Sequence, residues 1–141
     1  MMDRVVLRYY DGRVEKGYLV SFSETGSDVE IKEYKTERSI KAHLDELKAI
    51  FFVRSFEGNP GYREKKRYDR KGITAKKVFI RFKDKETLLG YVEGMLPWDK
   101  GFFLTKQHDR GKGFFVYPVD EESNNIKVFI VASSVEDVTV I

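Results

Sequence analysis

The sequence predicts a mostly β protein made of two tandem five-stranded small β-barrels packed together. Three observations predict this fold class: an internal repeat, short segments in which apolar and polar residues alternate, and a glycine inside the second strand of each copy. Residues 4–20 return as residues 77–93, and residues 42–53 return as residues 130–141. A repeat has to be recognised before a fold is assigned, because a duplicated unit changes the whole architecture. Two copies are too few for a solenoid, so we predict duplicated small domains.

The repeat also sets the predicted domain boundaries. We expect a first barrel at 1–57, a basic connector at 58–76, and a second barrel at 77–141 that contains an insertion at 95–118. Each copy is near the lower size limit at which a hydrophobic core can fold alone. We therefore expect the two halves to pack on each other or on a partner chain.

The first copy is expected to form five strands. Its opening segment, VVLRYY, places alternate apolar residues on one face, and the Asp11-Gly12 pair after it is a strong hairpin signal. Gly17 lies inside the next strand, where an isolated glycine often marks a bulge or a sharp bend. A single tight turn is predicted at Asp45–Leu47. The five strands are predicted at 5–10, 14–22, 29–34, 39–44 and 49–54.

The second copy repeats this plan with a longer middle. Gly90 again lies inside the second strand, and a turn at Ser133-Ser134 precedes the last strand. Two segments of the insertion, DKGFFL at 99–104 and GKGFFV at 112–117, are alike. We predict that they form a protruding hairpin with Trp98 at its base. The remaining strands are predicted near 78–83, 87–94, 126–132 and 136–141.

Composition excludes several classes of protein. The chain has no cysteine, so it forms neither a disulfide nor a thiolate metal site. A hydrophobic content of 41% with 14% aromatic residues argues against disorder. No apolar run is long enough to span a membrane, and the N-terminal MMDRVVLRYY lacks the residue order of a signal peptide. We therefore expect a cytoplasmic protein without a membrane partner.

The segment KVFIRFKDKETLLGYV at 77–92 resembles the opening of Sm domains, which have an apolar strand, a charged turn and a strand with a glycine. The resemblance implies an Sm-like (SH3-type) small barrel for each copy. The loops in which Sm proteins carry their RNA-binding Asp, Asn and Arg-Gly residues read SETGSD, HLDEL, LPWDKG and ASSVED here. The chain also resembles a widespread bacterial family of uncharacterised tandem-barrel proteins, through DELKAIFF at 45–52 and SNNIKVFIV at 123–131.

The positive charge of the chain is concentrated in the connector. Residues 58–77 carry eight basic and two acidic side chains, whereas 1–57 and 78–141 are each slightly acidic. Lysine and arginine clusters neutralise phosphates, and Tyr62 and Tyr68 could stack on the bases of an RNA. An alternative is a solvated connector whose basic groups bridge two acidic barrels. The candidate anion-binding residues are Arg63, Lys65, Lys66, Arg67, Arg70 and Lys71.

Arg63 and Arg67 have an R-x-x-x-R spacing just before a predicted barrel. This pair resembles the arginine motif of PilZ domains, and the resemblance implies that the connector wraps a cyclic dinucleotide. Guanidinium groups suit that ligand because they grip phosphates bidentately and stack on flat bases. PilZ domains also carry a D/N-x-S-x-x-G element. The nearest segment here, KETLLG at 85–90, has Lys85 in the first position and Thr87 in the third.

Adjacent phenylalanines occur at Phe51-Phe52, Phe102-Phe103 and Phe114-Phe115. Neighbouring side chains of a strand point to opposite faces. One member of each pair can therefore fill a core, while the other meets the sister barrel or a partner. Exposed strand edges of small barrels also invite pairing with a further strand. These features favour an interaction module that binds a protein partner or forms a homo-oligomer.

The sequence gives little support to catalysis. The two histidines, His43 and His108, occupy unmatched places in the two copies. His43 with Asp45 and Glu46 is a weak candidate metal pair, because metal sites need three or four convergent ligands. There is no nucleophile elbow, phosphate-binding glycine loop or H-E-x-x-H motif. We expect no catalytic residue, metal or cofactor.

The function predicted from the sequence is a non-catalytic bacterial interaction or regulatory module built from duplicated small barrels. The alternative is an anionic-ligand binder that holds RNA or a cyclic dinucleotide through the basic connector.

Overall fold

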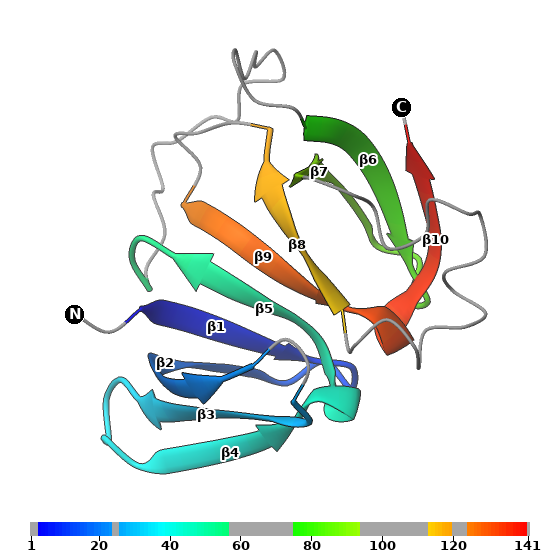
Figure 1. The fold of residues 1–141 in the computed structure, drawn as a ribbon. Helices are drawn as coiled ribbons and strands as arrows, with labels where there is room; N and C mark the ends of the chain where they lie inside the picture. The colour runs from blue at the N-terminus through cyan, green and yellow to red at the C-terminus, as the bar shows by residue number, and fades with distance from the viewer. Residues whose placement is uncertain (1–2, 24–25, 57–74, 94–112, 120–123, 141) are drawn as a thin grey trace.

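The computed structural model describes residues 3–23, 26–56, 75–93, 113–119 and 124–140. These residues form one ten-stranded antiparallel sheet with two short 3₁₀ turns, and no α-helix occurs among them (Figure 1). The predicted mostly β fold class is therefore confirmed. The strands are β1 (Arg4–Tyr9), β2 (Val14–Phe22), β3 (Asp28–Glu33), β4 (Ser39–His43), β5 (Leu47–Val53), β6 (Ala75–Phe82), β7 (Thr87–Glu93), β8 (Gly113–Pro118), β9 (Asn125–Val131) and β10 (Val135–Val140).

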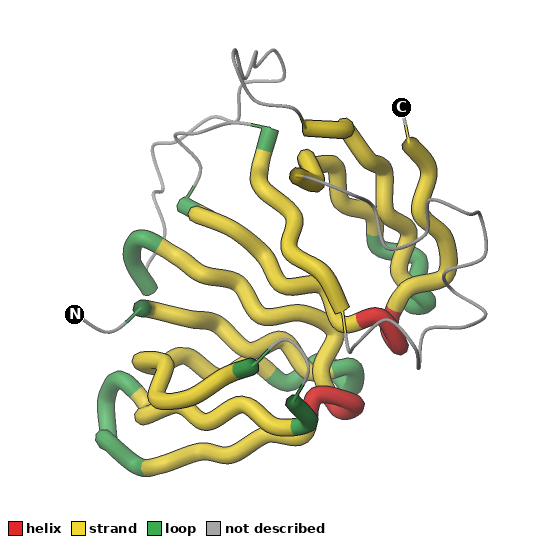
Figure 2. The backbone as a smooth tube through the Cα atoms, viewed as in Figure 1, coloured by secondary structure: helices red, strands yellow, loops and turns green. Residues whose placement is uncertain are grey.

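The two repeats have the same internal order. The sheet runs β10-β6-β7-β8-β9-β5-β1-β2-β3-β4, so each repeat is arranged as its fifth, first, second, third and fourth strands. The registers also correspond, because Val5 faces Gly17 in one repeat and Val78 faces Gly90 in the other. The two 3₁₀ turns, η1 (Leu44–Glu46) and η4 (Ala132–Ser134), each join the fourth strand to the fifth and are red in Figure 2.

Residues 113–118, predicted to lie in the insertion, form β8. This strand pairs with β7 at Tyr117 and with β9 from Gly113 to Val116, so it is the third strand of the second repeat. Alternate side chains of β8 point into the core, since Phe114 and Val116 are buried in the second repeat. The other half of the predicted hairpin, at 99–104, and its predicted base, Trp98, lie outside the described residues.

The strand glycines lie where neighbouring strands approach closely. A Cβ on Gly17 would overlap the Lys32 carbonyl group of β3. A Cβ on Gly90 would overlap the Val116 side chain of β8 and lie 2.8 Å from the Tyr117 carbonyl oxygen. Glycine at these positions therefore allows the second strand of each repeat to pass close to the third.

Two clusters of buried apolar side chains lie on opposite faces of the central strands. Along β5, Ala49 and Phe51 pack into the core of the second repeat, whereas Ile50 and Phe52 pack into the core of the first. Alternation along a strand produces this division, because successive side chains point to opposite faces. The expectation that one phenylalanine of a pair meets the sister repeat is confirmed for Phe51-Phe52.

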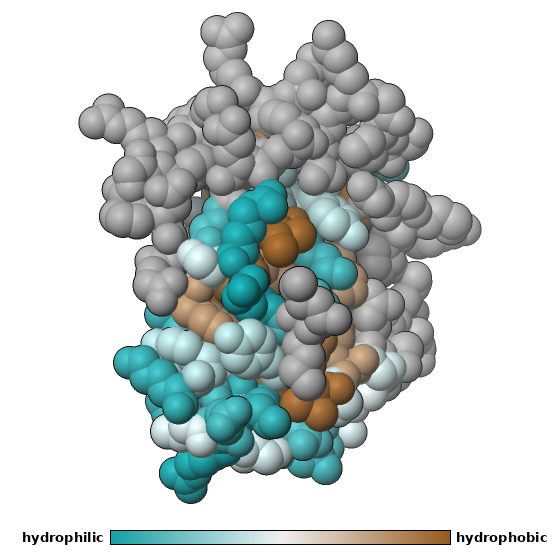
Figure 3. All heavy atoms as spheres, turned by 90° about the vertical axis from the view of Figure 1, so that its left-hand side faces the viewer, coloured by the Kyte–Doolittle hydropathy of each residue, from teal (hydrophilic) through white to brown (hydrophobic). Residues whose placement is uncertain are grey.

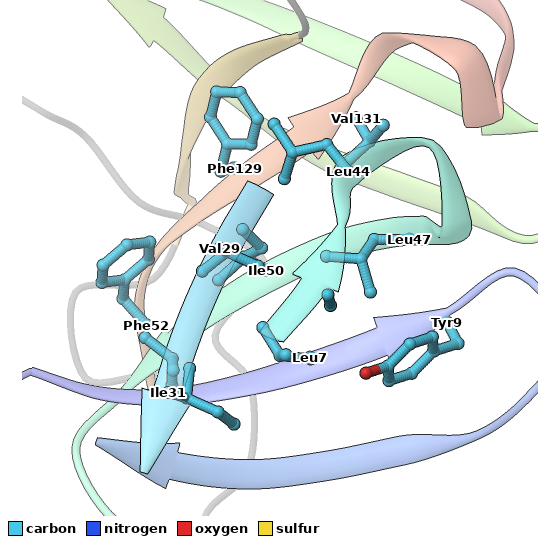
Figure 4. Close-up of a cluster of buried hydrophobic side chains, with 12 residues drawn as sticks. Leu7, Tyr9, Val29, Ile31, Leu44, Leu47, Ile50, Phe52, Phe129 and Val131 are labelled. Carbon is cyan, nitrogen blue, oxygen red and sulfur yellow. The ribbon is translucent and has the colours of Figure 1, made fainter. Parts of the chain in front are cut away.

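The same alternation holds on β9. Val128 and Ile130 belong to the core of the second repeat, while Phe129 and Val131 belong to the core of the first. Figure 4 shows Phe129 and Val131 among side chains contributed by the first repeat. β5 and β9 are paired antiparallel, so together they form a wall shared by both cores.

Candidate binding site

A cavity of about 760 Å³ lies on the first repeat, between the start of β2 and the connection from β3 to β4. Its wall combines apolar groups with charges of both signs. Figure 3 shows a similar mixture on the face at the left of Figure 1, where brown and tan residues lie in the middle and mainly teal residues below them. The lining residues that matter here are Val14, Glu15, Lys16, Tyr34, Arg38 and Ile40.

The turn that carries Tyr34 and Arg38 is held by one carboxylate. Glu33 Oε2 accepts hydrogen bonds from the backbone N–H of Thr36 at 2.6 Å, the backbone N–H of Lys35 at 2.8 Å and the hydroxyl of Thr36 at 2.9 Å. The N–H of Thr36 makes the largest contribution to lowering the pKa of Glu33 below its ordinary value of 4.5. The turn closes with Glu37 at a φ of 60°. This arrangement fixes one side of the cavity mouth.

An aromatic cluster orders the wall beside this turn. The Tyr34 ring lies 4.5 Å from the Phe56 ring between centroids, and the Tyr18 ring lies 5.5 Å from Phe56 in an edge-to-face arrangement. Lys16 Nζ donates a hydrogen bond to the Phe56 carbonyl oxygen at 3.1 Å. Lys16 therefore holds the end of the first repeat against the wall of the cavity.

Glu15 lines the cavity and is half-buried, with one buried carboxylate oxygen. Among the described side chains, its Oε2 is the buried polar atom that accepts no hydrogen bond. A buried carboxylate oxygen without a donor is costly, because its lost hydration is not replaced. A side chain or ligand that brought a hydrogen-bond donor to this oxygen would therefore be stabilised. One signal in the sequence could have indicated this site, namely a glutamate on the inward face of a strand.

Tyr9 lies next to Glu15 and is 5% exposed. Burial, followed by the negative charge of Glu15, raises the pKa of Tyr9 from 10.0 to about 12. The neutral phenol is thus favoured in the folded protein. Its contribution to stability is complete below pH 10 and is lost as the pH rises from 10 through 12.

We expect one of the eight tyrosines to ionise about two pH units later than an ordinary tyrosine, with a midpoint near pH 12. The ultraviolet absorbance of tyrosinate during a pH titration of the folded protein measures this midpoint. Tyr9→Phe should remove the late step and leave the others in place. A late step that survives in Tyr9→Phe would contradict the assignment.

The outer edge of β4 lies close to the cavity, since Arg38 and Ile40 are part of the lining. Within the described residues, β4 ends the sheet. Glu33 N donates to Arg38 O, and Leu44 N donates to Ser27 O, so even-numbered residues of this strand bond to β3. In an antiparallel ladder the alternate residues point the other way. The backbone N–H and C=O groups of Ser39, Lys41 and His43 therefore face away from β3.

The predicted anion-binding residues, from Arg63 to Lys71, lie outside the described residues. His43 Nδ1 accepts a hydrogen bond from the backbone N–H of Asp45 at 3.3 Å, at the start of η1. The residues that the structure describes contain no group of three or more His, Cys, Asp or Glu side chains that could hold a metal ion. His108 also lies outside the described part of the chain.

Comparison with known families covers the complete chain. Residues 1–141 match the model of a family of unknown function, DUF6982. The chain belongs to DUF6982. The DUF6982 model includes both repeats, so the duplicated unit as a whole corresponds to the family. No curated protein matches the chain. In the described segments, no helix has the length and apolar character needed to cross a membrane.

Proposed function

We propose that the chain is a non-catalytic bacterial interaction module that binds an extended segment of a protein partner along β4. In this proposal each repeat is an Sm-like small barrel. The support for the barrel is the shared strand order, with a glycine in each second strand where it passes close to the third. The observation that carries the function is the pairing of β5 with β9, in which the two repeats associate through strand edges.

The β4 edge offers the same kind of backbone contact to another strand. The N–H and C=O groups of Ser39, Lys41 and His43 are directed outward, and a bound segment would continue the antiparallel sheet. The cavity adds specificity, because it lies beside the first residues of β4. A side chain of the bound segment that carries an apolar stem and a terminal donor would fit between Tyr34 and Glu15. Main-chain hydrogen bonds then provide affinity, and the cavity selects the sequence.

Selection from a phage-displayed library of random peptides tests this proposal. We expect enriched peptides to bind the protein, and Lys41→Pro to weaken their binding at least tenfold, as measured by fluorescence anisotropy. Proline removes an N–H that points away from β3, so the fold should tolerate it at this edge. Lys32→Ala, on the neighbouring strand β3, is the matched control and should bind as the parent does. Unchanged binding to Lys41→Pro would contradict the proposal.

The second candidate is an anionic-ligand binder that uses the connector, and the charge excess of residues 58–77 favours it. The same measurements separate the two candidates. A thermal shift with cyclic dinucleotides or short RNA that weakens with salt, and that disappears in the Arg63→Ala, Arg67→Ala double variant, would support this candidate. Loss of peptide binding in Lys41→Pro alone would support the β4 edge.

A further inference from the structure

Four apolar side chains of β5 and β9 cross the joint between these two strands. Ala49 and Phe51 extend from the first repeat into the core of the second. Phe129 and Val131 extend from the second repeat into the core of the first (Figure 4). The joint is therefore more than a backbone ladder, because each repeat contributes side chains that complete the core of the other.

Because the chain is repeated, positions equivalent to these four can be identified on the outer strands β4 and β10. Ile50 of β5 faces Leu7, and Val138 of β10 faces Ile80. Each fifth strand also skips one residue in this pairing, at the point where its register shifts. The 3₁₀ turns begin at Leu44 and Ala132, which gives the same offset between the fourth strands. The residues equivalent to Ala49, Phe51, Phe129 and Val131 are therefore Asp137, Thr139, Lys41 and His43.

All four equivalent residues are polar, and all four are exposed. A joint between β4 of one chain and β10 of a second chain would place these side chains where the internal joint places apolar ones. Burying an unpaired polar group is unfavourable, and burying an unpaired charge is more so. Charged side chains at such positions are a known protection of sheet edges.

We propose that β4 and β10 are prevented from pairing with β10 and β4 of a second copy, so that the chain does not extend into a ring or a fibre. The backbone of β4 stays available to a single extended segment, which brings no second core and leaves Lys41 and His43 in water. This inference concerns assembly of the chain with itself, and it holds whether or not the partner segment proposed above exists.

Exchanging the four residues for their apolar equivalents tests the inference. One chain carries Lys41→Phe and His43→Val, and another carries Asp137→Ala and Thr139→Phe. We expect each variant alone to be monomeric, since each has only one permissive edge. An equimolar mixture should form a one-to-one heterodimer, and a chain with all four changes should form larger assemblies, as measured by light scattering after size-exclusion chromatography.

A disulfide identifies the contact in the mixture. Phe52 faces Lys127 in the internal joint, and their equivalents are Val140 and Ser39. The natural chain has no cysteine. Ser39→Cys in the first variant and Val140→Cys in the second should therefore crosslink under oxidation. Lys32→Phe, which adds an exposed aromatic side chain away from the edge, is the matched control and should stay monomeric.

Two results would overturn the inference. One is a parent protein in which Ser39→Cys and Val140→Cys crosslink between chains, because the outer strands would then pair as they stand. The other is a mixture of the two edge variants that remains monomeric although both are folded by circular dichroism. Both edge variants replace exposed side chains and keep the internal joint, so they test the inference even where the fourfold variant fails to fold. Neither result depends on peptide binding.

Discussion

Replacing Phe129 with alanine should lower the free energy of unfolding by about 3–5 kcal/mol. Phe129 is fully buried, and its ring lies 4.9 Å from the Phe22 ring and 5.2 Å from the Phe115 ring between centroids. The substitution loses the free energy gained by burying the ring. It also leaves a cavity that the strands on either side of the joint cannot close. Although Phe129 belongs to the second repeat, the damage should appear in the core of the first.

Equilibrium unfolding in urea measures this effect, with Ile126→Ala as the control on the same strand. Ile126 is 45% exposed, so its truncation should change stability by no more than about 0.5 kcal/mol. A loss below about 1 kcal/mol for Phe129→Ala would contradict the view that β9 completes the core of the first repeat. In that case, the backbone amides of β1 and β3 should be as well protected from hydrogen exchange in the variant as in the parent.

Replacing Lys48 with alanine should cost about 3 kcal/mol of stability, because the loss of its buried apolar stem leaves a cavity. Lys48 is 4% exposed, and its Nζ lies 2.9 Å from Asp84 Oδ2, in contact with Glu86, and 4.6 Å from the centre of the Phe82 ring. It projects from the unpaired position of β5, whereas its partners lie in and beside the turn from β6 to β7. Lys48 therefore links the two repeats at a second place.

Lys48→Met is the informative companion. Methionine keeps most of the apolar stem, and Asp84 and Glu86 are 41% and 52% exposed, so water can solvate both carboxylates when the charge is removed. We expect a loss of about 1 kcal/mol or less for this variant. Lys85→Ala serves as a surface control, because the Lys85–Glu136 pair is exposed and should contribute little. A Lys48→Ala protein as stable as the parent would contradict the proposed link.

The repeat made much of the fold predictable. The alternation of Val5, Leu7 and Tyr9 and the Asp11-Gly12 turn locate the first hairpin, and β1 and β2 lie where the pattern predicts. The repeat then transfers this plan to β6 and β7. The predicted tight turn at Asp45–Leu47 is present one residue earlier, at Leu44–Glu46. Local pattern suffices for these elements, because neighbouring segments pair with each other.

The third strand of the second repeat was harder to predict. Its segment, GKGFFV, has a near copy at 99–104, which suggested a self-contained hairpin. The actual pairing of β8 with β9 depends on contacts across the second core, which no local pattern records. The bond from Ser134 Oγ to the Lys48 carbonyl oxygen, at 2.9 Å, is likewise a contact between repeats.

The candidate site was not predictable, because its wall is assembled from segments that are apart in the sequence. Tyr34 and Arg38 depend on the turn held by Glu33, whereas Glu15 and Lys16 come from a different strand. The sequence directed attention to the connector, where charge is concentrated. Lys48, a lysine in an otherwise apolar strand whose equivalent Glu136 carries the opposite charge, was a usable signal for the contact between the repeats and not for this site.

The wall shared by β5 and β9 has a consequence for how the protein unfolds. Since each of these strands packs a core on either face, removing one repeat would strip the inner lining from the other. The two halves should therefore behave as a single cooperative unit, which melts in one transition even though its sequence reads as two. The boundary between the two repeats in the sequence is thus not a boundary between two independently stable units.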